Sequence, residues 1–152
     1  MSAKSLSATH IIGAVIAGYA STCITFFFLL DFYWFGSAPY QPDHVFGFIY
    51  PHNEHGTVKY LSAFQVTSWS LLFGTFFPAF IIAGALMPRP DMKKWPRWCT
   101  ESLTNPDEDP KGRLKWWMLA SAAVTSILLV VLGAPLVRAL NEAGLVLNLY
   151  SG

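Results

Sequence analysis

The chain has 152 residues, of which 53% are hydrophobic and only 12% are charged, and its mean hydropathy is +0.40. A soluble globular domain normally carries about twice this share of charged residues, so the composition indicates a membrane protein. The formal net charge of +1 provides no electrostatic field for a polyanion, which argues against nucleic-acid binding.

Three apolar stretches, residues 9–35, 61–87 and 116–135, are each long enough to cross a lipid bilayer. A helix needs about 20 predominantly apolar residues to span the hydrocarbon core. Backbone polar groups in that core must be paired within their own segment. We therefore predict an all-α membrane protein with three transmembrane helices, which form a single integral membrane domain over residues 1–152.

The C-terminal tail has two interpretations, because its apolar residues continue beyond Pro135 but are interrupted by Arg138, Asn141 and Glu142. It is either a helix that continues through the proline or a short amphipathic segment on the outer surface. We favour the second. The polar segment 92–110, which contains two tryptophans, is predicted to lie along the inner surface.

The distribution of basic residues predicts the orientation, because Lys and Arg near span ends are retained on the cytoplasmic side. Seven of the ten basic residues lie between the second and third stretches, whereas the loop 37–60 contains only Lys59. We expect a cytoplasmic N-terminus and a periplasmic C-terminus in a bacterial inner or intracytoplasmic membrane. Arg138 is the basic residue that disagrees with this orientation.

Small residues recur at spacings of three and four in the first and third stretches, which is typical of surfaces where membrane helices pack closely. The predicted packing residues are Gly13, Ala14, Ala17, Gly18, Ser21, Ala122 and Ser126.

Three of the four histidines lie in the loop 37–60. His52, Glu54 and His55 can offer two imidazoles and a carboxylate to a transition metal, with His44 as a fourth donor. The spacing differs from that of helical zinc motifs, in which the two histidines are four residues apart.

The alternative for this loop is a structured hairpin at the membrane surface, with turns supplied by Pro51, Asn53 and Gly56. Residues 50–61 resemble a stretch found in assorted small bacterial membrane proteins. The resemblance implies no activity and names no family.

Two further ionisable residues belong to the first stretch. Asp31 lies near its outer end, where a carboxylate can reach headgroups or cap a helix; the competing interpretation is a proton relay or a ligand contact. His10 lies at the inner edge and can ligate a haem or pigment jointly with another subunit, or contact a quinone. An ordinary interfacial histidine is the alternative.

These features predict a non-catalytic accessory subunit of a larger energy-transducing complex, respiratory or photosynthetic, whose helices pack on a core subunit. The alternative is a membrane anchor or a small electron-transport subunit that contributes ligands to a haem, pigment, quinone or metal site. No catalytic residue and no cofactor of its own is predicted. The expected partners are other membrane subunits and lipids.

Overall fold

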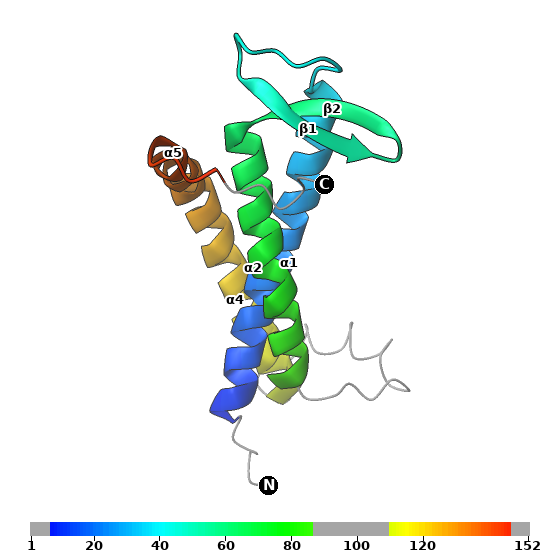
Figure 1. Cartoon of the computed structure of the whole chain (residues 1–152). Helices are drawn as coiled ribbons and strands as arrows, with labels where there is room; N and C mark the ends of the chain where they lie inside the picture. Colours follow the sequence, from blue (N-terminus) through cyan, green and yellow to red (C-terminus); the bar gives the residue numbers. More distant parts are fainter. Residues whose placement is uncertain (1–6, 87–109, 147–152) are drawn as a thin grey trace, which may run out of the picture. The chain divides into compact units, whose positions relative to one another are not determined.

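The computed structural model describes residues 7–86 and 110–146. The elements follow in the order α1 (Ala8–Ser37), β1 (Phe48–Glu54), β2 (Thr57–Ser62), α2 (Ala63–Leu86), α4 (Pro110–Leu128), the π-helical turn η2 (Leu129–Gly133) and α5 (Ala134–Glu142) (Figure 1). The predicted surface segment 92–110 lies outside the described residues except for Pro110.

Three helices are long and apolar enough to cross a membrane: Ala8–Ser37, Ala63–Leu86 and Leu114–Glu142. This confirms the prediction of three helices that can span a bilayer. The chain is mostly helical but not all-α, because β1 and β2 pair as an antiparallel hairpin. The second helix begins at Ala63 and not at Leu61, since Leu61 and Ser62 belong to β2.

The third helical run does not end near Pro135, because α4, η2 and α5 follow one another without a break. A proline inside a helix removes one N–H donor and crowds the preceding turn. The π-helical turn directly before α5 widens the backbone at that point. The separate surface segment that we favoured from the sequence is thus the end of the third helix, and the alternative of a continuing helix is the one observed.

The third run ends in a glycine cap. Gly144 has φ +77, a left-handed conformation that glycine adopts without steric penalty. The N–H groups of Gly144 and Leu145 donate to the carbonyls of Asn141 and Leu140 at 3.0 and 2.9 Å.

The described residues form two compact units. The first comprises residues 7–22, 77–86 and 110–126, and the second comprises residues 23–76 and 127–146. Because α1 and α2 contribute residues to both units, the division does not separate successive domains, and the single domain stays a prediction.

In the first unit, α1 and α4 pack closely at Gly18. A Cβ atom placed on Gly18 would overlap the backbone carbonyl oxygen of Met118 and would lie 3.1 Å from the amide nitrogen of Ala122. The hydroxyl of Ser121 donates to the carbonyl of Val15 at 2.7 Å. This close approach of two backbones is available only because position 18 has no side chain.

The other predicted packing residues differ in burial. Those of α1 nearest the contact, Gly13, Ala14 and Gly18, are buried. The remainder are half-buried: Ala17, Ser21, Ala122 and Ser126. The surface around Gly18 is therefore occupied within this chain.

The hairpin turn has two central residues with positive φ, His55 at +50 and Gly56 at +84. Such a two-residue turn matches the right-handed twist of paired strands. The Asn53 side-chain carbonyl accepts a hydrogen bond from the Gly56 N–H at 3.1 Å. Asn53 and Gly56 form the turn as predicted, whereas Pro51 lies within β1.

In the second unit, the hairpin lies across the end of α1 and the start of α2 (Figure 1). Apolar side chains fill the space beneath it, and their removal from water or headgroups stabilises the arrangement. The cluster consists of Ala38, Leu61, Val66 and Trp69, with Phe27, Trp34 and Tyr50 packed against it.

Candidate functional site

Four ionisable residues of the second unit lie in the region where the hairpin covers the end of α1: Asp31, His52, Glu54 and Lys59. We call them the junction cluster. His52 and Glu54 share the inner face of β1 because strand residues two apart point the same way, and Lys59 is the cross-strand partner of His52. The Glu54 carboxylate acts electrostatically on both Asp31 and His52.

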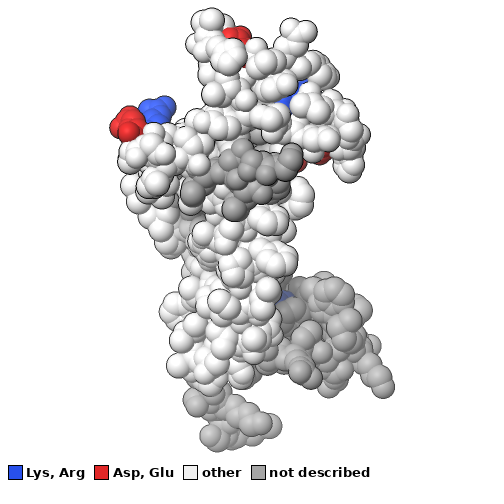
Figure 2. All heavy atoms as spheres, viewed as in Figure 1, with Lys and Arg blue, Asp and Glu red and all other residues white. Residues whose placement is uncertain are grey.

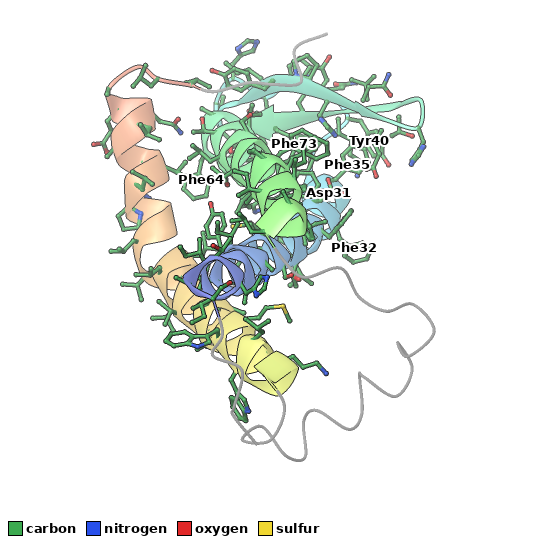
Figure 3. The ribbon with its side chains drawn as sticks, turned by 90° about the horizontal axis from the view of Figure 1, so that it is seen from below. Asp31, Phe32, Phe35, Tyr40, Phe64 and Phe73 are labelled. Carbon is green, nitrogen blue, oxygen red and sulfur yellow. The ribbon has the colours of Figure 1, made fainter. Side chains whose placement is uncertain are left out.

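A ring contact brings the strand face against the helix. The rings of Phe35 and His52 have centroids 5.7 Å apart. Asp31 lies one helical turn before Phe35, on the same face of α1. Figure 3 shows Asp31, Phe35 and Tyr40 together at this end of α1.

Lys59 is a buried cation that caps α1. Its side chain is only 7% exposed, and its ammonium group donates to the carbonyl oxygens of Phe35 at 2.6 Å and Gly36 at 3.3 Å. It also lies 4.9 and 4.8 Å from the ring centroids of Phe35 and Tyr40. The last carbonyls of a helix lack intrahelical partners and carry partial negative charge, so the ammonium satisfies them and is itself stabilised.

The sequence identifies Lys59 only as the basic residue of the loop 37–60 and does not predict its role at the end of α1. The strand pattern does contain information about Lys59. In a strand, Lys59 points to one face while its neighbours Val58 and Tyr60 point to the other, and one of these two faces is expected to be buried. The pattern does not say which face that is.

His52 packs edge-on against Trp69, with ring centroids 4.4 Å apart and an interplanar angle of 65°. Burial lowers the pKa of His52 below its ordinary value of 6.5, and the Glu54 carboxylate partly opposes this. The neutral imidazole is therefore the favoured form at neutral pH. A charged imidazolium in this position would lose much of its hydration.

The remaining predicted metal donors lie apart from this packing. His44 is exposed in the loop before β1, and His55 is exposed in the hairpin turn. Among the residues that the structure describes, no three His, Cys, Asp or Glu side chains are grouped so as to hold a metal ion. The metal site of His44, His52, Glu54 and His55 stays a prediction.

His10 belongs to the first unit, in the first turn of α1, and is half-buried. Its backbone N–H donates to the carbonyl and the hydroxyl oxygens of Ser7 at 3.1 and 3.3 Å, which is an N-terminal cap. The imidazole contact with haem, pigment or quinone stays a prediction.

The loop before β1 is closed by hydrogen bonds of Asp43 and presents two apolar side chains, Val45 and Phe46, which we call the loop tip. The backbones of Asp43 and Phe48 exchange two hydrogen bonds of 2.9 Å. The Asp43 carboxylate also accepts the N–H groups of Val45 and Phe46 at 3.0 and 3.1 Å. Val45 and Phe46 are nevertheless 88% and 74% exposed.

Comparison of the chain with protein-family models, curated proteins and solved structures found no match. The functional interpretation therefore depends on the geometry of the described residues.

Proposed function

We propose that this chain is a non-catalytic accessory subunit of a larger membrane complex, and that it binds a partner subunit through the loop tip. Following the sequence, the complex is of the energy-transducing kind in a bacterial inner membrane, with the N-terminus cytoplasmic and the hairpin and C-terminus periplasmic. The observation that carries the proposal is the exposure of Val45 and Phe46 on a hydrogen-bonded loop outside the three candidate spans.

Burial within a transmembrane helix does not account for this exposure, because residues 43–48 belong to none of the helices that can span a membrane. Two adjacent large apolar side chains in a polar environment favour contact with another protein surface. The loop is already ordered by the hydrogen bonds of Asp43. Less conformational entropy is then lost on binding than for a flexible loop.

The junction cluster supports the same proposal by providing a fixed base for the loop. Lys59 connects β2 to the end of α1, and His52 packs on Phe35 of α1 and Trp69 of α2. These side chains are engaged in holding the hairpin to the helices. This arrangement favours a structural role, in which the hairpin positions the loop tip, over a catalytic role.

The third helical run offers a second contact surface. Only 6% of its most apolar 18-residue window is buried within the chain, compared with 33% for each of the other two candidate spans. Val124, Ile127 and Val131 follow the spacing of one helix face and are 56%, 63% and 60% exposed. Membrane helices associate through such outward faces when a partner helix is complementary in shape.

The test is native extraction in mild detergent followed by mass spectrometry of the tagged chain. We expect a defined second subunit with the unmodified protein, and its loss with Phe46→Asp, which places a charge on the loop tip. Thr57→Asp adds the same charge at the exposed far end of the hairpin and should retain the partner. A stable, lone monomer recovered from native membranes would contradict the proposal.

A further inference from the structure

A pocket of about 400 Å³ lies between the first turn of α2 and α5, lined by Phe64, Arg138, Asn141 and Glu142. Figure 3 shows Phe64 on the side of α2 that faces α5. The volume is within the range of sites for small ligands. The pocket is open, so a ligand can enter it from the surroundings.

The two walls of this pocket are fastened to each other. The hydroxyl of Thr67, which is fully buried, donates to the side-chain carbonyl of Asn141 at 2.9 Å. This bond leaves the two N–H groups of the Asn141 amide available as donors. The pocket wall therefore contains a polar group that is oriented by a buried hydroxyl.

The bounds of the candidate spans place the pocket at the depth expected for phospholipid headgroups. One candidate span begins at Ala63 and another ends at Glu142, and the ends of transmembrane helices lie in the interfacial region of a bilayer. A ligand at this place is in contact with phospholipid headgroups on one side and with acyl chains on the other.

Arg138 and Glu142 are one helical turn apart, and basic and acidic atoms lie side by side over α5 (Figure 2). The order of this pair is the less favourable one for helix stability, because an acidic residue before a basic one at this spacing stabilises a helix more. The carboxylate of Glu142 also stands at the C-terminal end of a helix, where the partial negative charge of the carbonyls disfavours it.

The four side chains match the two ends of a zwitterion. A guanidinium binds a phosphate with two parallel hydrogen bonds, and the Asn141 amide can donate to the same group or to an ester oxygen. The Glu142 carboxylate accepts hydrogen bonds from a primary ammonium. Phe64 provides an apolar surface for the glycerol or the start of an acyl chain.

We propose that this pocket binds the headgroup of phosphatidylethanolamine, with its phosphate on Arg138 and its ammonium on Glu142. Phosphatidylglycerol has a phosphate but no cation for Glu142. Phosphatidylcholine has a cation but no N–H donor. The proposal accounts for Arg138, the basic residue that disagrees with the predicted orientation, and it is independent of any partner subunit.

The experiment is native mass spectrometry of the full chain in detergent, after exchange into equal amounts of the three lipids. We expect selective retention of phosphatidylethanolamine, reduced about tenfold or more by Arg138→Gln and by Glu142→Gln, because each removes a hydrogen bond to a charged group. Equal retention of the three lipids, or stronger retention of phosphatidylglycerol, would overturn the proposal.

The matched control is the double variant Arg138→Glu with Glu142→Arg, which keeps the net charge and places the pair in the order that favours the helix. If the pair were only structural, this variant would unfold at the same temperature or higher and retain lipid unchanged, and the proposal would fail. We expect unchanged folding but a loss of lipid selectivity. In this variant a carboxylate stands where the phosphate would bind, and a guanidinium stands where the ammonium would bind. Equal binding of soluble phosphoethanolamine would also overturn the lipid assignment.

Discussion

The ammonium group of Lys59 lies 2.6 Å from the backbone carbonyl oxygen of Phe35, so a side chain of β2 completes the C-terminal end of α1. The contact joins residues 24 positions apart in the sequence. It explains how a short two-stranded hairpin, which is marginally stable in isolation, is held in a defined place.

Replacing this lysine should loosen the hairpin selectively. Lys59→Met leaves the carbonyls of Phe35 and Gly36 without their donor, and we expect a loss of about 1–3 kcal/mol in local stability. Hydrogen exchange measured by mass spectrometry should show faster exchange of residues 48–62 and unchanged exchange of α4. Lys59→Arg keeps the positive charge and the N–H donors, so the loss of local stability should be smaller than in Lys59→Met. Unchanged hairpin protection in the Met variant would refute this role.

A side chain at Gly18 should separate α1 from α4. Gly18→Ala places a Cβ against the backbone of Met118, and overpacking of this kind costs about 1–3 kcal/mol. We expect a lower thermal unfolding temperature in detergent. Gly36→Ala is the matched control in the same helix, because a Cβ there meets no atom within 4 Å. If both variants unfold at the same temperature, the close contact is not important for stability.

The bond between Thr67 and Asn141 should fix α5 against α2. Thr67→Val keeps the shape of the side chain but removes the hydroxyl, so the Asn141 carbonyl loses its donor. We expect about 1–2 kcal/mol of destabilisation, with faster exchange in residues 134–142. Thr75→Val, in the same helix, removes only a hydroxyl that bonds to its own helix, and it should have a smaller effect.

The stability of the hairpin should decrease on acidification through His52. Its pKa in the folded protein is below the ordinary value of 6.5 because of burial, so the unfolded segment binds the proton more strongly. The neutral His52 imidazole therefore contributes fully to hairpin stability above about pH 6.5. This contribution is lost as the pH falls below about 6.5 and passes through the pKa of His52 in the folded protein. Hairpin exchange measured against pH should show this loss. It should persist in His55→Gln and disappear in His52→Gln.

Elemental analysis should separate the metal-binding interpretation from the structural one. Because His52 packs against Trp69 while His55 stands exposed in the turn, we expect His52→Ala and His55→Ala to leave the metal content of the purified protein unchanged. A stoichiometric metal that is lost in both variants would instead establish the sequence-based site.

The sequence by itself determined the three helices that are long and apolar enough to span a membrane, because a bilayer imposes a length and an apolar composition that can be counted along the chain. It also determined the hairpin turn, since Asn53 and Gly56 favour a local geometry that needs few distant partners. The predictions of three apolar helices and of a hairpin between the first two agree with the described helices and strands. Both features depend on neighbouring residues.

Only the tertiary structure decided which polar residues face inward. A strand alternates its side chains, but the neighbour that it packs on selects the buried face, so Lys59 and His52 could not be assigned to the end of α1 from the pattern. The passage of the third helix through Pro135 likewise required a widened turn that propensity does not predict. The pocket beside Arg138 includes Asn141, whose side chain is bonded to Thr67, a residue 74 positions before Asn141. Long-range contacts of this kind are set by packing and not by local sequence.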